Sequence, residues 1–138
     1  MASDPIRIVL DSNVLISSYV FGGKPESVLK LIIADKLQGV TSQSLISEFL
    51  DVLRKKFKVS SNEIQRVQNE IQELFEIVYP KETLHVVRDE DDNRVIEAAI
   101  EGNCDCIITG DKDLLDLGKF KNIKILTADQ FLSVREWQ

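Results

Sequence analysis

The residues of this chain with the clearest capacity for chemistry are acidic side chains that follow short apolar runs. Asp11 comes directly after Ile-Arg-Ile-Val-Leu, and Asp111 follows Cys-Ile-Ile-Thr-Gly, where we expect Gly110 to permit a tight turn. Runs of this kind are typical of buried strands, and ligands bind beyond the carboxyl ends of strands in open α/β sheets. Each aspartate also precedes a predicted helix and could serve only as its cap. Two of them at one edge of a sheet favour a shared site.

A run of four carboxylates, Asp-Glu-Asp-Asp at 89–92, opens another predicted helix. Acidic residues are favourable in a first helical turn, so a solvated helix start with Asp89 as its cap is the simplest explanation. Asp92 differs from its neighbours because apolar residues follow it three, four and seven positions later, which continues the buried stripe of the helix. Asp91 has Arg94 three positions later and is the weaker alternative. We therefore expect Asp92 to face the sheet.

Glu48 lies at the border of the apolar arc in the amphipathic segment 42–57. A border glutamate is commonly a surface residue with a buried stem. If it joins Asp11, Asp92 and Asp111, with Asp113 close by, the group needs a counter-charge, because clustered carboxylates raise one another's pKa. Mg²⁺ or Mn²⁺ would supply that charge, since hard divalent ions take oxygen ligands and can activate water against a phosphodiester.

The elements that must position these acids alternate along the chain. Strands are predicted at 6–11, 106–109 and 123–126, with a minimal strand at 39–40. Helices are predicted at 12–20, from Pro25 to about 37, at 42–57, from a capping box at 60–63 through Leu74 and Phe75, from the acidic run to Gly102, at 111–117, and from Thr127 to 137. Strands alternating with helices indicate the α/β class, as a three-layer α/β/α sandwich with a mostly parallel sheet.

The composition is that of a globular chain of 138 residues, which we expect to form a single domain over 1–138. A net charge of −6 argues against a broad basic surface for nucleic acid, so any contact with a polyanion needs a local patch such as Arg54–Lys58 or Lys119, Lys121 and Lys124. Two cysteines and one histidine do not make a zinc site. No window has the length of a membrane span and the first residues lack a signal peptide, so a cytoplasmic location without membrane association is expected.

Four segments in this order resemble the PIN-domain family, whose members are small metal-dependent ribonucleases that include the VapC-type toxins of toxin–antitoxin pairs. The matching segments are IVLDSNVLIS, SEFLDVL, DEDDNRVIEAAIEGNCDCIITGDKDLL and IKILTADQFL, and they frame nearly the whole chain. The most specific part is TGDKDLL after a strand. One departure is Glu90, where close relatives often have proline, and this keeps Asp91 as an alternative to Asp92.

The resemblance implies a role for each of the acidic residues. The catalytic set would be Asp11, Glu48, Asp92 and Asp111, and the metal ligands would be Asp11, Asp92, Asp111 and Asp113. Ser12, Asn13, Asn93 and Thr109 would orient carboxylates or substrate by hydrogen bonds. The family also implies a sheet of about five strands, a homodimer, and an antitoxin protein as partner.

We therefore expect an Mg²⁺- or Mn²⁺-dependent endoribonuclease that hydrolyses RNA to a 5′-phosphate and a 3′-hydroxyl and acts as a toxin. Lys112, Arg54 and Lys55 are candidates for guiding the RNA backbone. Two alternatives stay open. A catalytically silent PIN-like module would bind RNA or act as a scaffold. Another Mg²⁺-dependent phosphate-handling enzyme, such as a phosphatase or receiver domain, would use a strand-end aspartate, although the expected companion acids after the first strand are missing.

Overall fold

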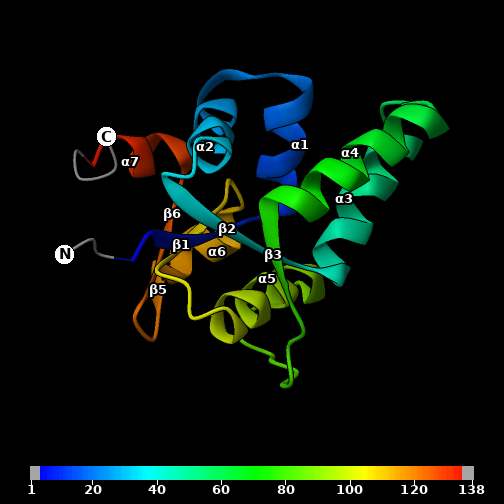
Figure 1. Ribbon diagram of the computed structural model, residues 1–138. Coiled ribbons are helices and arrows are strands. Elements are labelled where there is room, and N and C mark those ends of the chain that lie inside the picture. The colour runs from blue at the N-terminus through cyan, green and yellow to red at the C-terminus, as the bar shows by residue number, and fades with distance from the viewer. Residues whose placement is uncertain (1–3, 135–138) are drawn as a thin grey trace.

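The computed structural model describes residues 4–134, and its centre is one sheet of six strands in the order β3-β2-β1-β4-β6-β5 (Figure 1). The strands are β1 (Ile6–Leu10), β2 (Leu37–Ser42), β3 (Phe75–Val78), β4 (Cys106–Ile108), β5 (Lys119–Phe120) and β6 (Ile123–Leu126). Neighbouring strands pair in parallel except β5 and β6, which form an antiparallel edge. The expected α/β class and mostly parallel sheet are confirmed, with six strands where about five were expected.

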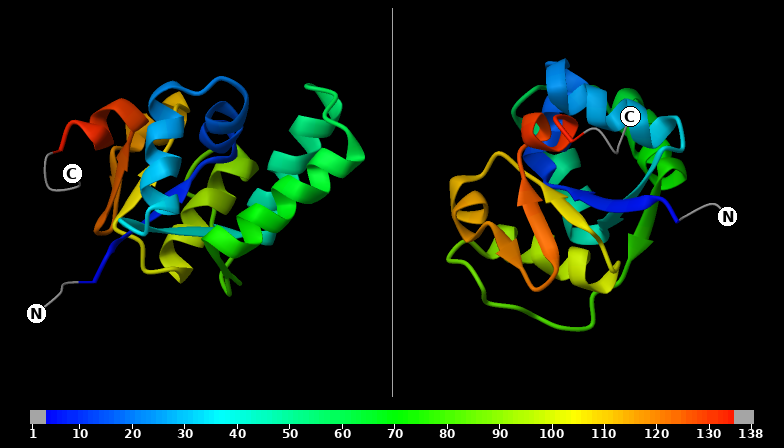
Figure 2. Two further views of the ribbon diagram at one scale, coloured as in Figure 1. Left: turned by 45° about the horizontal axis from the view of Figure 1, so that its top comes forward. Right: turned by 90° about the vertical axis from the view of Figure 1, so that its left-hand side faces the viewer.

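Helices cover both faces of the sheet and make three layers (Figure 2). They are α1 (Ser12–Val20), α2 (Gly23–Ile33), α3 (Gln43–Lys55), α4 (Ser61–Leu74), α5 (Glu90–Glu101), α6 (Lys112–Leu117) and α7 (Ala128–Leu132). Side chains alternate along β1, so Ile8 and Leu10 pack in the core beneath α1–α4 and α7, whereas Val9 packs in the second core beneath α5 and α6. Both cores hold the carboxyl ends of β1 and β4 in place.

One strand is longer than the sequence indicates, and two were missed. The minimal strand expected at 39–40 is the six-residue β2, whose glycine and hydroxyl residues hide its alternation. The helix expected to continue through Phe75 stops at Leu74, because Phe75 begins β3. Ile71, Leu74 and Phe75 keep a helical spacing across this junction, so the pattern alone could not locate the change. The two-residue β5 was also missed.

The helix ends follow the expected signals in part. Helix α2 begins at Gly23, two residues before Pro25, which is tolerated because an N–H of the first turn has no intrahelical partner. It ends at Ile33 rather than near 37, and Asp35 makes the turn with a φ of 60°. Ser60 caps α4 through Glu63 N, and Thr127 with Gln130 forms a full capping box on α7. Helix α7 ends at Leu132, and residues 135–138 of the longer helix expected there lie outside the described residues.

Within residues 4–134, no helix combines the length and apolar character needed to cross a bilayer.

We expect Gly39→Ala to destabilise the protein, because β2 and β3 approach each other closely at this position. A Cβ at residue 39 would lie 2.7 Å from the Phe75 ring and 3.1 Å from Ile32 Cδ1. Overpacking of this kind costs about 1–3 kcal/mol of unfolding free energy. Denaturant unfolding followed by circular dichroism measures the loss, and Phe75→Leu in the same chain should restore part of it. Unchanged stability of Gly39→Ala would contradict this packing.

Candidate functional site

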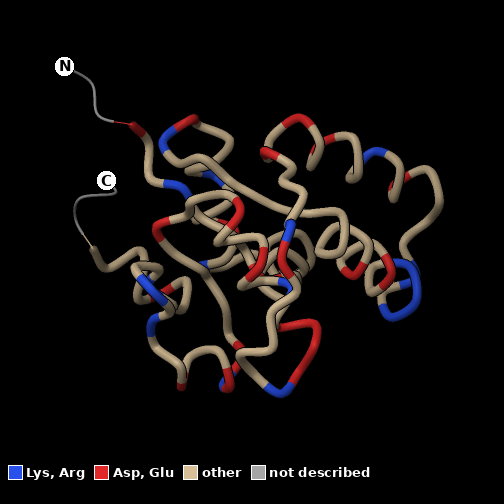
Figure 3. Tube along the Cα trace, turned by 90° about the horizontal axis from the view of Figure 1, so that it is seen from below, with Lys and Arg blue, Asp and Glu red and all other residues tan. Residues whose placement is uncertain are grey.

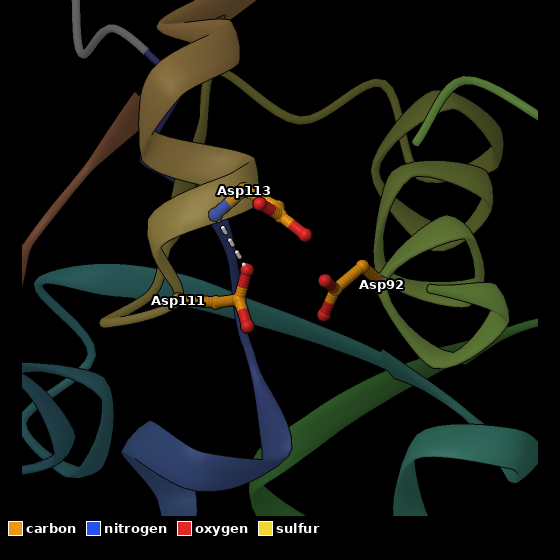
Figure 4. A group of neighbouring side chains, drawn as sticks. All are labelled: Asp92, Asp111 and Asp113. Atoms are coloured by element: carbon orange, nitrogen blue, oxygen red, sulfur yellow. Dashed lines mark hydrogen bonds between the residues drawn. The ribbon is translucent and has the colours of Figure 1, made fainter. Parts of the chain in front are cut away.

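Three aspartates from two helices face one another at the carboxyl edge of the sheet (Figure 4). Asp92 comes from the first turn of α5, and Asp111 and Asp113 lie at the start of α6. One carboxylate oxygen from each of them lies within 4.8 Å of the others. We call Asp92, Asp111 and Asp113 the aspartate cluster. Asp92 is 6% exposed, whereas Asp91 is exposed, so the buried face extends through Asp92 as expected from the sequence.

A chain of hydrogen bonds fixes the aspartate cluster to the ends of β4 and β1. Asp111 Oδ1 accepts hydrogen bonds from the N–H groups of Asp113 at 2.9 Å and Leu114 at 3.3 Å, so this carboxylate does cap α6. Its own N–H donates to Thr109 Oγ1 at 2.9 Å, and the Thr109 hydroxyl donates to Asp11 Oδ2 at 2.7 Å. Asp111 therefore caps α6 with one oxygen and still offers the other oxygen to a ligand in the site.

The carboxyl of Asp92 has a strongly raised pKa. Burial, followed by the negative charges of Asp111 and then Asp11, raises the pKa of its carboxyl to about 7. Asp92 Oδ2 is buried and has no hydrogen-bond partner among residues 4–134. A buried carboxylate oxygen without a partner is costly to a fold unless a proton or a cation compensates it.

Asp11 and Glu48 form a second acidic group beside the aspartate cluster. The Ser12 hydroxyl contacts both, donating a short hydrogen bond to Glu48 Oε1 and a longer one of 3.5 Å to Asp11 Oδ1. Burial raises the pKa of both carboxyls, opposed by hydrogen bonds from Thr109 to Asp11 and from Ser12 to Glu48. The charge of Asp91 also raises the pKa of Glu48, which places Asp91 on the Glu48 side. Of the four expected metal ligands, the structure brings together Asp92, Asp111 and Asp113 and leaves Asp11 adjacent to them.

The polar residues expected to assist the acids differ in their contacts. Ser12 and Thr109 hold carboxylates, whereas Asn13 is exposed at the edge of a neighbouring hollow. Asn93 turns away from the cluster, because its side chain accepts hydrogen bonds from the N–H groups of Val86 and Val87 at 2.9 and 3.0 Å and donates to Val87 O at 2.9 Å. Its contacts therefore hold the loop before α5 rather than a substrate. No pattern in the sequence predicted these hydrogen bonds between Asn93 and the loop.

One basic side chain of the described residues reaches the aspartate cluster. Arg88 Nη2 lies 3.4 Å from Asp113 Oδ2, but the Arg88 side chain is 90% exposed. Exposed pairs of this kind contribute about 0–1 kcal/mol, so Arg88 does not close the site. The cluster remains open to a cation from solution.

A groove of about 680 Å³ runs from the second acidic group between α3 and α5. Both helices bring charges of both signs to this groove: Glu48, Asp51, Lys55 and Lys56 lie on or directly after α3, and Glu90, Asp91 and Arg94 lie on α5. Figure 3 shows the basic stretch at the tip of the hairpin made by α3 and α4. Of the basic residues expected to guide RNA, Lys55 lines this groove, whereas Arg54 pairs with Asp51 at 3.2 Å and Lys112 with Asp116 at 2.6 Å.

The donor set fits a hard divalent cation. All three groups of the aspartate cluster offer carboxylate oxygens, and one of these oxygens is buried without a partner. Mg²⁺ and Mn²⁺ favour such oxygen donors, with water or phosphate completing the coordination. Asp92, Asp111 and Asp113 would hold the ion.

Comparisons with known proteins identify the family and the fold of this chain. A family model described as "PIN domain" matches residues 7–113. "Uncharacterized protein MJ1680" of Methanocaldococcus jannaschii is 34% identical over 140 residues, which span 92% of this chain and 90% of that protein.

Two solved structures share the fold. VapBC2 from Rickettsia felis, bound to a DNA fragment from its promoter, matches with a TM-score of 0.58 and 13% identity over 87% of this chain and 97% of the other. VapBC-1 from nontypeable Haemophilus influenzae matches with a TM-score of 0.60 and 16% identity over 90% of this chain and 99% of the other. Identities this low concern the fold alone.

We expect the metal-free protein to lose stability as pH rises from about 4 to about 7, because the pKa of Asp92 is higher in the folded chain. In this window the folded state binds more protons than the unfolded state, so unfolding becomes easier as protons are removed. Asp92→Asn has no carboxyl proton to release at this position, so it does not lose stability in this way as pH rises. Its stability relative to wild type should therefore be greater at pH 8 than at pH 4.5, by about 1–3 kcal/mol in EDTA.

Chemical denaturation at the two pH values measures this difference, and Asp35→Asn at an exposed turn is the control. Mg²⁺ at pH 8 should stabilise the wild type and Asp35→Asn, but stabilise Asp92→Asn much less. Equal pH dependence in wild type and Asp92→Asn would refute the assignment of this proton to the aspartate cluster.

Proposed function

This chain belongs to the PIN-domain family, and on that premise we propose that it is a metal-dependent endoribonuclease. The observation that carries the proposal is the aspartate cluster, with three carboxylate oxygens within 4.8 Å and a buried, unpartnered oxygen on Asp92. A bound divalent ion would activate water and offset negative charge on the phosphate. The surrounding residues would keep this cluster in place: Thr109 ties it to Asp11, and Ser12 ties Asp11 to Glu48.

Asp11 and Glu48 take positioning and proton-handling roles in this proposal. The pKa of both carboxyls is raised, so each is better able to hold a proton than an exposed carboxyl would be. Glu48 faces the groove between α3 and α5, where it would meet the attacking water or the leaving oxygen. Lys55 and Lys56 on the same groove would attract the RNA backbone at a distance from the acidic residues.

We extend the proposal to the biological setting, where the chain would act as the toxin of a toxin–antitoxin pair and form a homodimer. The family resemblance and the shared fold with two VapBC structures support this extension. The antitoxin would be a protein whose segment occupies the groove beside Glu48 and keeps RNA away from the aspartate cluster. A silent RNA-binding module with the same fold is the competing explanation, and turnover separates the two.

We expect purified protein to cleave single-stranded RNA in Mg²⁺ or Mn²⁺ and to leave 5′-phosphate ends. Asp92→Asn removes a ligand and should lower kcat/KM by at least about 100-fold, whereas Asp11→Asn acts through Thr109 and Ser12 and should lower it about 10–100-fold. Asp35→Asn, at the opposite edge of the sheet, should retain wild-type activity.

Chelation should abolish cleavage and added Mn²⁺ should restore it. Cleavage that persists in Asp92→Asn after chelation would come from a contaminant. If RNA binds with no cleavage under any metal condition, the silent-module explanation replaces the nuclease.

Expression of the wild-type chain in a bacterial host should arrest growth, because an unrestrained ribonuclease depletes cellular RNA. Asp92→Asn should be harmless, and Asp35→Asn should be as toxic as wild type. Plating efficiency after induction measures the effect, with immunoblots to match expression levels. Normal growth with active, soluble protein would count against a toxin role while leaving the nuclease activity intact.

A further inference from the structure

Gly110 stands beside the aspartate cluster without a structural reason to be glycine. It is exposed, its φ lies outside the left-handed region, and a Cβ built on it meets no atom within 4 Å. The turn that we expected Gly110 to permit does not need a glycine, because alanine fits both the backbone and the space. Glycine also costs stability relative to alanine, since it gives the unfolded chain more freedom.

At two other positions, the packing of the protein itself requires glycine. A Cβ at Gly39 would lie 2.7 Å from the Phe75 ring, and a Cβ at Gly102 would lie 2.7 Å from Val40 Cγ1 and 3.1 Å from the Ala98 carbonyl oxygen. Both positions are packed against the protein itself. At Gly110 the space that a side chain would fill opens outward instead, which is the pattern of a backbone that a ligand approaches closely.

A hollow of about 290 Å³ adjoins Gly110 and shares no lining residue with the groove between α3 and α5. Thr109 and Gly110 line it together with polar side chains from three helices, namely Asn13 and Ser17 of α1, Lys24 of α2 and Asp129 of α7. Lys24 Nζ lies 3.7 Å from Asp129 Oδ1, and both side chains are largely exposed, so the ammonium group is free to exchange partners. An amide, a hydroxyl and an ammonium group around an open backbone match the needs of a ribose and its phosphate.

We propose that this hollow binds the sugar–phosphate of the nucleotide next to the scissile phosphate, and that Gly110 is glycine to let that backbone pass. This inference rests on the proposed ribonuclease function and adds a substrate subsite to it. The hollow and the groove share no lining residue, and hydrogen bonds link each of them to the acidic residues. Thr109 of the hollow accepts one from the N–H of Asp111, and Glu48 of the groove accepts one from Ser12, which also donates to Asp11. An RNA strand crossing the cluster would thus be held on both sides of the cleaved bond.

The test is Gly110→Ala, compared with wild type for stability, metal binding and cleavage of one defined single-stranded RNA in Mn²⁺. We expect the melting temperature to stay at or slightly above that of wild type, because nothing in the protein contacts the added methyl group and alanine restricts the unfolded chain, and we expect the Mn²⁺-induced stabilisation to be unchanged. Cleavage should fall by at least about tenfold in kcat/KM, because that methyl group overpacks the bound backbone. Lys24→Gln should weaken substrate binding and lower the salt dependence by about one phosphate contact.

Two controls make the result specific. Gly102→Ala should lose stability, and its activity should fall only as folded protein is lost. RNA trimmed to a single nucleotide without its outer phosphate on the hollow side of the cleaved bond should be cut equally by wild type and Lys24→Gln; trimming from each end in turn identifies that side. Wild-type activity in Gly110→Ala would overturn the subsite, whereas an inactive wild type would overturn the proposed function itself.

Discussion

The structure depends on holding several negative charges together at one partly buried edge of a sheet. Hydrogen bonds from the protein satisfy most of these charges: Thr109 donates to Asp11, Ser12 to Glu48, and the backbone of α6 to Asp111. Asp92 is different because one of its oxygens is buried with no partner among the described residues, and the pKa of this carboxyl is raised to about 7. The protein scaffold therefore leaves one charge for a proton or a cation to compensate, and this binding capacity comes from the fold itself.

The order of the sheet explains how residues so far apart in sequence meet. β1 lies between β2 and β4, so Asp11 after β1 comes next to Thr109 after β4, and Thr109 carries Asp111 with it. Asp92 comes from α5, which lies in the same helical layer as α6. Val95 and Ile96 of α5 pack in the core beneath the same strands and hold Asp92 at this edge. One residue connects β1 to α1 and three connect β4 to α6, so Asp11 and Asp111 have little freedom to move apart. Asp92 follows the connection 79–89 after β3, and the hydrogen bonds of Asn93 to Val86 and Val87 hold that connection against α5. Rigid placement of this kind suits a metal site, which tolerates small errors poorly.

Residue patterns in the sequence predict much of this arrangement, and their failures have physical reasons. Strand-end aspartates and the apolar stripe after Asp92 point to one edge, and the site forms there. Spacing does not fix which oxygens lie within reach of a single ion, because that depends on side-chain partners such as Ser12, which draws Glu48 and Asp11 to one side. Asn93 bonds to a loop without regular structure, and no periodicity could reveal it. β2 and β3 were hard to recognise in the sequence for a related reason. Gly39 of β2 has no side chain, and the Phe75 ring of β3 occupies the space that one would fill.

The charge distribution gives the proposed enzyme a coupling between metal and substrate. The chain has a net charge of −6, and its most concentrated negative field lies where a phosphodiester would have to sit. Lys55 and Lys56 line the groove together with acidic residues such as Glu48 and Asp91, and Lys24 lines the hollow beside Asp129, so the cations next to this negative centre lie within acidic surroundings. Without a cation, an RNA strand gains contacts at the groove and the hollow and pays a Coulomb penalty between them. A bound divalent cation would lower that penalty, and by linkage the RNA would tighten the metal site by the same factor. A fold that carries this much negative charge therefore favours metal and RNA together over either one alone.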